Sequence, residues 1–217
     1  MVGFKISTNI ERDSNVNLDY ILTKNADDVF ERIIYNYGRG QHAFSVIGSY
    51  GTGKSTFLWA LQKHLEGKRK FSKSFASEFK DIKSFQFSRI VGESCSFKEK
   101  FCEVFGLAKL AESSNKKILK GFAALLEDIQ SQKGSLVLLV DEFGKHLEFV
   151  AKKNPDELYF IQELAEFCND NERNVIFITT LHQNFSSYAK GFSKAEKSEW
   201  DKVRGRFIEI AFDDILK

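Results

Sequence analysis

The sequence predicts an α/β fold in which a parallel, five-stranded sheet carries helices on both faces, giving three layers. Two observations support this prediction. Short β-prone segments alternate with helical segments along the chain, an order typical of right-handed crossovers between parallel strands. In addition, Leu136–Val140 is an apolar run without alternation, and Val175–Thr179 is a similar run. Such runs are typical of strands buried on both faces of a parallel sheet.

Hydrophobic spacing and helix-end signals place the elements in order. Residues 1–26 are polar and predict a lead-in, and residues 27–217 predict a single domain. Asn154-Pro155-Asp156-Glu157 combines a cap, a proline and early acids, which predicts the start of a helix. The other expected elements are a helix at 27–37, a strand at 43–47, a helix at 56–66, a strand at 83–90, helices at 97–108 and around 118–129, strands at 136–140 and 175–179, a helix near 194–203 and a strand at 207–212.

Composition limits the class of protein. The chain has 217 residues, 42% of them hydrophobic and 29% charged, as in ordinary globular domains. Its net charge of +2 is too small to indicate a nucleic-acid partner, so DNA stays open as a partner without support from charge. No apolar stretch approaches the roughly 18 residues of a membrane span, so we expect no membrane partner. The scattered cysteines Cys95, Cys102 and Cys168 favour buried thiols, which predicts a reducing, cytoplasmic location.

Residues 48–55 read Gly-Ser-Tyr-Gly-Thr-Gly-Lys-Ser, which matches the pattern G-x-x-x-x-G-K-[ST] between a strand and a helix. Glycines let the backbone wrap tightly, so that consecutive N–H groups point at phosphate oxygens near a helix N-terminus. Lys54 is expected to reach the β- and γ-phosphates of a nucleotide, and the Ser55 hydroxyl to ligate Mg²⁺. The predicted nucleotide-binding residues are Gly48, Ser49, Tyr50, Gly51, Thr52, Gly53, Lys54, Ser55 and Thr56.

A second motif follows the apolar run at 136–140, which ends in Asp141-Glu142. Parallel strands deliver such side chains to the carboxyl edge of a sheet, where ligands bind. Asp141 is expected to hold Mg²⁺ opposite Ser55, directly or through water. Glu142 is expected to polarise a water for in-line attack on the γ-phosphate.

Gly48–Ser55 and Leu136–Glu142 resemble the Walker A and Walker B motifs of P-loop ATPases of the AAA+ and STAND type, the division with an inserted strand and a catalytic glutamate. The resemblance spans roughly residues 30–212 and implies a P-loop NTPase fold. AAA+ proteins continue into a helical lid, whereas this chain stops at Lys217, so we expect a fragment or a lid supplied by a partner. Asp141–Glu148 is also similar to the corresponding segment of large bacterial ATPases, some of them associated with phage defence.

The resemblance implies further site residues near the C-terminus. Thr179–Gln183 ends a strand where this group of ATPases keeps a polar sensor of the γ-phosphate, a role for which Thr180, His182 and Gln183 compete. Arg204 and Arg206 lie before the last strand, in a segment similar to the one that supplies an arginine finger to a neighbouring AAA+ subunit. This similarity implies a homo-oligomer.

Together these residues predict a Mg²⁺-dependent ATPase that couples hydrolysis of ATP to a conformational change. ATP is favoured because no Asn-Lys-x-Asp motif for reading guanine occurs. Two alternatives stay open. One is a P-loop kinase of small molecules, although no arginine-rich lid segment is apparent. The other is a nucleotide-dependent, DNA-associated switch or scaffold with little turnover.

Overall fold

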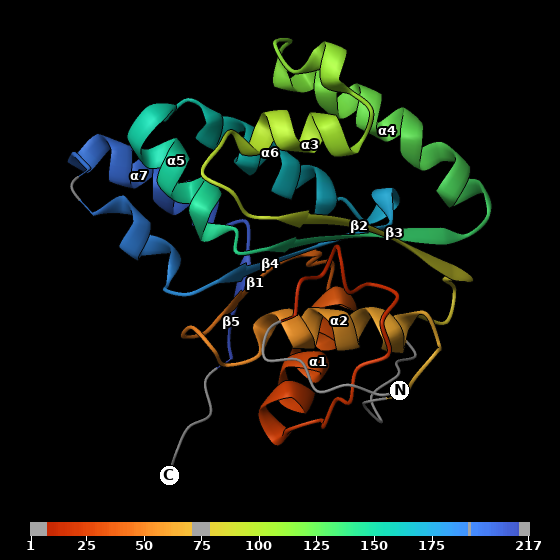
Figure 1. Ribbon diagram of the computed structural model, residues 1–217. Coiled ribbons are helices and arrows are strands. Elements are labelled where there is room, and N and C mark those ends of the chain that lie inside the picture. The colour runs from red at the N-terminus through yellow and green to blue at the C-terminus, as the bar shows by residue number, and fades with distance from the viewer. Residues whose placement is uncertain (1–7, 71–78, 191, 213–217) are drawn as a thin grey trace.

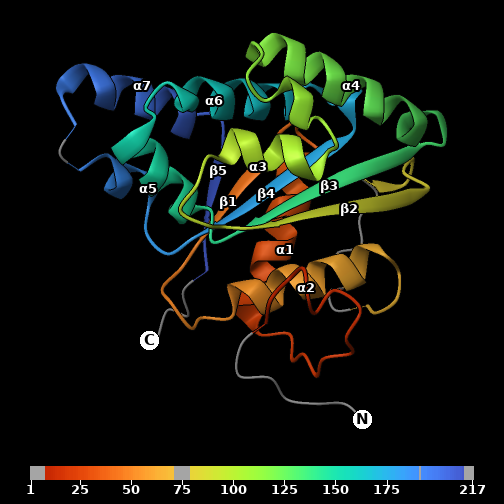
Figure 2. The same ribbon diagram turned by 45° about the horizontal axis from the view of Figure 1, so that its top comes forward.

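The computed structural model describes residues 8–70, 79–190 and 192–212. Its centre is a five-stranded sheet in which every pair of neighbours is parallel, with the order β2-β3-β4-β1-β5. Figure 2 shows this order from β5 to β2. The predicted parallel α/β sheet is therefore confirmed. The strands are β1 (Ala43–Ile47), β2 (Ser84–Val91), β3 (Gly134–Asp141), β4 (Val175–Leu181) and β5 (Ile208–Ala211).

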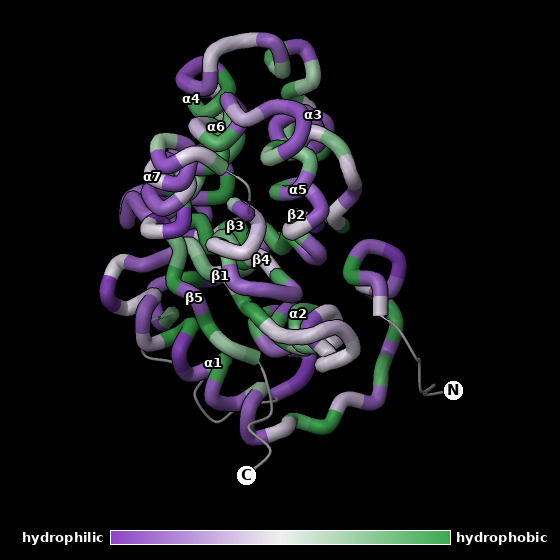
Figure 3. Tube along the Cα trace, turned by 90° about the vertical axis from the view of Figure 1, so that its left-hand side faces the viewer, coloured by the Kyte–Doolittle hydropathy of each residue, from purple (hydrophilic) through white to green (hydrophobic). Residues whose placement is uncertain are grey.

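Helices cover both faces of the sheet, as predicted (Figure 1). Alternate residues of the buried strand β3 point to opposite layers. Leu136, Leu138 and Val140 pack with α3 to α7, whereas Val137 and Leu139 pack with α1 and α2. Figure 3 shows from the side that α1 and α2 lie on one side of the strands and α3, α4 and α6 on the other. The helices are α1 (Lys24–Tyr37), α2 (Lys54–Leu65), α3 (Phe97–Val104), α4 (Asn115–Ser131), α5 (Gly144–Lys153), α6 (Glu157–Cys168) and α7 (Lys194–Arg204).

Strand β4 lies between β1 and β3, so a strand is inserted between those that carry the two motifs. The register places the carboxyl ends of all three at one edge, because Ile47 pairs with Leu181 and Val140 with Thr179. Three segments far apart in sequence therefore meet where the candidate site is expected.

Several predicted element ends shift by a few residues in the structure, and the clearest differences are at α1, α3 and α5. Helix α1 begins at Lys24 and not at residue 27, because the Thr23 side chain accepts a hydrogen bond from the Ala26 N–H and caps it. Helix α3 ends at Val104 and not at residue 108, because Gly106 takes a positive φ of 66°. Helix α5 was not predicted. It has ten residues, and Phe143, at its N-cap, makes no side-chain capping bond among the described residues.

Residues 8–23 of the predicted lead-in pack against the domain. Ile10 and Leu18 are 1% and 3% exposed. The Trp59 indole N–H of α2 donates to the carbonyl of Val16 at 3.2 Å, and Arg69 donates to the carbonyl of Leu18 at 2.8 Å. The boundary at residue 26 stays a prediction, and residues 1–7 and 213–217 of the two predicted segments lie outside the described residues. Within the described ranges, every helix is too short or too polar to cross a membrane.

Candidate functional site

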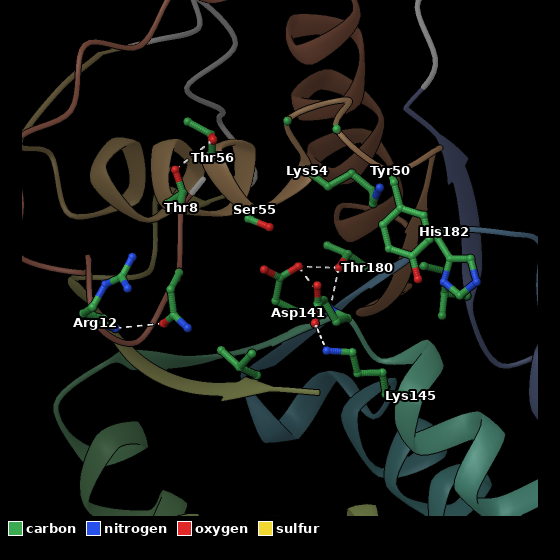
Figure 4. Close-up of a pocket in the computed structure, with 16 residues that line it drawn as sticks. Thr8, Arg12, Tyr50, Lys54, Ser55, Thr56, Asp141, Lys145, Thr180 and His182 are labelled. Atoms are coloured by element: carbon green, nitrogen blue, oxygen red, sulfur yellow. Dashed lines mark hydrogen bonds and ion pairs between the residues drawn. The ribbon is translucent and has the colours of Figure 1, made fainter. Parts of the chain in front are cut away.

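The two predicted motifs line one cavity of about 400 Å³ at the carboxyl edge of the sheet (Figure 4). Six of the predicted nucleotide-binding residues border it, together with the residues expected to bind Mg²⁺, activate water and sense phosphate. The first group is Tyr50, Gly51, Gly53, Lys54, Ser55 and Thr56, and the second adds Asp141, Glu142, Thr180 and His182.

The loop between β1 and α2 has the conformation that its glycines allow. Gly51 and Gly53 take φ values of 78° and 91°, in the left-handed region that favours glycine. Gly53 is also the N-cap of α2, and in the described part of the chain no side chain caps that helix. Its first-turn N–H groups and its dipole therefore face the cavity as an anion site.

Lys54 folds back over the loop. Its Nζ donates to the carbonyl oxygens of Gly48 and Ser49 at 2.5 and 2.6 Å. The Thr52 hydroxyl donates to the same Ser49 carbonyl at 2.9 Å, and the Gly48 N–H donates to Leu181 at 3.0 Å. Gly48, Ser49 and Thr52, three of the predicted binding residues, thus hold the loop in its conformation. A bound phosphate can replace the two backbone carbonyls as the partner of the Lys54 ammonium.

Asp141 is held in a fixed orientation. Its carboxyl group is 4% exposed, and its Oδ1 accepts hydrogen bonds from the Thr180 hydroxyl at 2.5 Å and from the Glu142 N–H at 3.1 Å. Figure 4 shows the Ser55 hydroxyl on the side of the cavity facing Asp141. A hydroxyl and a carboxylate that face each other are the oxygen ligands that Mg²⁺ prefers, so the donor set fits this ion. The Thr180 hydroxyl, predicted as a sensor, contacts this carboxylate.

Glu142 has a strained backbone, with a φ of 53°. Its N–H donates to the Thr180 hydroxyl at 2.9 Å, and its carboxylate pairs with Lys145 in the first turn of α5. This hydrogen bond raises the pKa of Lys145 above its ordinary value. Sequence reasoning missed Lys145 because helix α5, which carries it, was not predicted.

Gly92 is a second residue that sequence reasoning missed. A Cβ added to Gly92 would lie 2.0 Å from the carbonyl oxygen of Glu142, and its N–H donates to the carbonyl of Asp141 at 2.7 Å. Only a glycine lets the backbones approach this closely. The available signal was a glycine two residues after the end of the predicted strand at 83–90.

An aromatic group forms one wall of the cavity. The Tyr50 ring stacks on His182 with centroids 4.7 Å apart and an interplanar angle of 20°. The Tyr188 hydroxyl lies 3.0 Å from Nδ1 of His182, and burial raises the pKa of that hydroxyl. His182 therefore links the loop after β1 to the segment after β4. Gln183 does not line the cavity in the described chain.

The two predicted finger arginines lie elsewhere. They precede β5, at the amino edge of the sheet, whereas the loop of Lys54 follows the carboxyl end of β1, which is parallel to β5. Nε of Arg206 pairs with Glu166 at 2.7 Å, and Nε of Arg204 pairs with Glu209 at 3.3 Å. The structure does not bring either arginine to the cavity of its own chain.

The N-terminal segment supplies an unexpected wall. Thr8, Asn9 and Arg12 border the cavity together with Val91 at the end of β2. The polar composition of residues 1–26 carried no signal for this contact, because it depends on packing against α2 and β2.

No protein-family model matches the sequence, and no curated protein sequence matches it either. Solved structures do resemble it. The Aeropyrum pernix ORC2 protein in ADPNP–ADP complexes superimposes with a TM-score of 0.59 at 14% identity, covering 92% of this chain and 51% of that one. The ADP form of ORC2 gives 0.55 at 13% identity, with 93% and 52% covered. The chain thus spans about half the length of these structures, and it shares their fold.

Proposed function

We propose that this chain is a Mg²⁺-dependent ATPase module that couples ATP hydrolysis to a conformational change. The observation that carries this proposal is the meeting of three groups in one cavity. These are the uncapped N-terminus of α2 with Lys54, the oriented Asp141 opposite Ser55, and Glu142 beside them. The similarity of the fold to ORC2 structures solved with ADPNP and ADP supports nucleotide binding.

Each side chain then has a defined role. Lys54 and the first N–H groups of α2 bind the phosphates. Ser55 and Asp141 hold Mg²⁺, which when bound neutralises charge on the phosphate oxygens. Thr180 keeps Asp141 oriented. Glu142 accepts a proton from the attacking water or orients it, after its carboxylate has left Lys145.

The Tyr50–His182 pair supports the coupling. Tyr50 belongs to the loop proposed to bind phosphate, and this residue is 72% exposed. Nucleotide that rearranges this loop also changes the stacking on His182 and hence the contact with Tyr188. Tyr188 belongs to the segment Phe185–Ala189 that precedes α7. A change at the site can therefore be transmitted through this segment to the surface of the module.

Release of inorganic phosphate from ATP, measured with Mg²⁺ and with or without DNA, tests the function. We expect slow release that needs no DNA and no acceptor molecule, and that stops in Lys54→Ala. Tight ATP binding without release would favour a nucleotide-dependent switch. Phosphate transfer only in the presence of a small hydroxyl-bearing acceptor would favour a kinase.

We further propose that Arg206 or Arg204 completes the site of a neighbouring copy. Their side chains are 46% and 45% exposed, and both lie away from the cavity of their own chain. Their ion-pair partners Glu166 and Glu209 are 40% and 28% exposed, and such surface ion pairs contribute little to stability.

A further inference from the structure

The cavity contains a third cation besides Lys54 and Lys145. Arg12 belongs to the segment before α1, and this segment is fixed to the site at several points. The Thr8 hydroxyl lies 3.0 Å from that of Thr56 on α2, and Glu11 accepts a hydrogen bond from the Val91 N–H of β2 at 3.2 Å. Ile10, between them, is 1% exposed. Residues 8–12 therefore form one side of the cavity and are anchored to α2 and β2.

The guanidinium of Arg12 is held by its neighbour in sequence. Its Nε and Nη2 donate to the two carboxylate oxygens of Asp13 at 3.0 and 3.1 Å. The Arg12 side chain is 65% exposed, whereas that of Asp13 is 1% exposed. Asp13 also accepts a hydrogen bond from the Asn9 N–H at 3.0 Å, so it keeps a donor when the arginine leaves. The backbone is anchored, and the exposed guanidinium can exchange Asp13 for another anion.

The position of Arg12 relative to the proposed phosphate site indicates which part of a nucleotide it can bind. Figure 4 shows Arg12 on the wall opposite Tyr50 and His182, with Ser55 and Asp141 between the two walls. A triphosphate bound at Lys54 and Ser55 places its terminal phosphate in this interval. Arginine presents a planar fork of N–H donors that matches two phosphate oxygens, so Arg12 suits this anion better than a lysine would.

We propose that Arg12 is a catalytic residue that acts in cis by leaving Asp13 and binding the terminal phosphate of bound ATP. The inference rests on the proposed ATPase function. As the water oxygen bonds to the γ-phosphorus, the bond from that phosphorus to the bridging oxygen breaks, and ADP leaves with the electron pair. Glu142 takes the proton of the water, and Arg12 neutralises charge on the γ-oxygens. An anchored arginine in the same chain makes this contribution independent of assembly.

Two substitutions at this position test the proposal. Arg12→Gln removes the charge, and Arg12→Lys keeps the charge but removes the fork. Arg39→Gln is the matched control, because Arg39 is exposed on α1's C-terminal side and does not line the cavity. For each variant, binding of ADP and of a non-hydrolysable ATP analogue is titrated in Mg²⁺, and phosphate release is measured over a dilution series.

We expect Arg12→Gln to weaken binding of the ATP analogue about tenfold or more while ADP affinity changes less than about twofold, since only the analogue carries the γ-phosphate. Turnover should fall by on the order of 10²-fold at every protein concentration, and Arg12→Lys should recover only part of it. Equal effects on ADP and ATP analogue, or none on either, would overturn the proposal and leave the Arg12–Asp13 pair a structural contact. A wild-type chain that binds neither nucleotide would instead overturn the proposed function.

Discussion

At the scale of single residues, the site is prepared before any ligand binds. Asp141 is oriented by two donors on one carboxylate oxygen, and Glu142 is held at a strained φ of 53° by its N–H bonds. Buried, hydrogen-bonded carboxylates cost little reorganisation when a cation arrives. The mobile groups are the cations. Lys54 lies on backbone carbonyls and Lys145 on Glu142, and both contacts are exchangeable.

Lys54→Ala is expected to weaken ATP binding by on the order of 10²-fold, because it removes a charge-assisted contact with two phosphates. The fold should be unchanged, since the Lys54 ammonium donates to the loop carbonyls of Gly48 and Ser49 and to the Thr52 hydroxyl, all in the loop that precedes α2. A nucleotide titration with circular dichroism of the variant checks both statements. Affinity equal to that of the wild type would remove Lys54 from the site.

Glu142→Gln should keep ATP binding and lose on the order of 10²-fold or more in turnover, because the carboxylate acts on water and not on the phosphates. Phosphate release and a binding titration are measured on the same preparation. Turnover equal to the parent would assign Glu142 a structural role. Weaker binding in Mg²⁺, with unchanged binding in its absence, would assign it to the metal.

At the scale of elements, the site depends on how closely strand ends approach. Strands β2 and β3 are paired along their whole length, from Ser84 with Gly134 to Val91 with Asp141. The chain then turns from β3 into α5 directly beneath β2, which brings the Glu142 carbonyl against Gly92. The same arrangement on the other side of β3 puts Thr180 of β4 beside Asp141. The carboxylates of Asp141 and Glu142 are thus positioned by contacts from both neighbouring strands.

Gly92→Ala is expected to lower the free energy of unfolding by about 1–3 kcal/mol, because the new Cβ would lie 2.0 Å from a backbone oxygen that must shift. The shift moves Glu142, so turnover should fall more than ATP affinity. Gly205→Ala is the matched control, since its Cβ would meet its nearest atoms at 3.4 Å. Denaturant unfolding of both variants measures the difference. Equal stability of the two would contradict the close approach as a constraint.

At the scale of the whole molecule, the candidate site and the two predicted finger arginines lie at opposite edges of the sheet. The proposed nucleotide site lies at the carboxyl edge of the sheet, and Arg204 and Arg206 lie toward the amino edge near the start of β5. Arg204 and Arg206 can therefore reach a bound phosphate only in a second copy of the chain. Arg12, in contrast, borders the cavity of its own chain. An arginine finger predicts that turnover per chain falls on dilution, whereas the contribution of Arg12 is independent of dilution.

If Arg206 acts in a neighbouring site, turnover per chain should rise with protein concentration, since an arginine finger contributes ~10³–10⁵-fold in rate. Mixing Arg206→Ala with Glu142→Gln should then restore some turnover, because one interface combines an intact finger with an intact glutamate. Phosphate release from each variant alone and from the mixture measures the effect. If the mixture is no more active than the separate variants and turnover per chain is constant on dilution, Arg206 does not act as an arginine finger.

The sequence by itself determined the parallel α/β architecture, most strand positions and the residues of the two motifs, because each is written in a short window. The octet at 48–55 carries its own turn and helix start, and the apolar run at 136–140 carries its own burial. Three features were decided only by the tertiary structure. Thr180 orients Asp141, the backbone of Glu142 packs against Gly92, and Arg12 lines the cavity. The first two contacts join residues 39 and 50 positions apart, and they exist only because the strand order brings separate chain segments to one sheet edge.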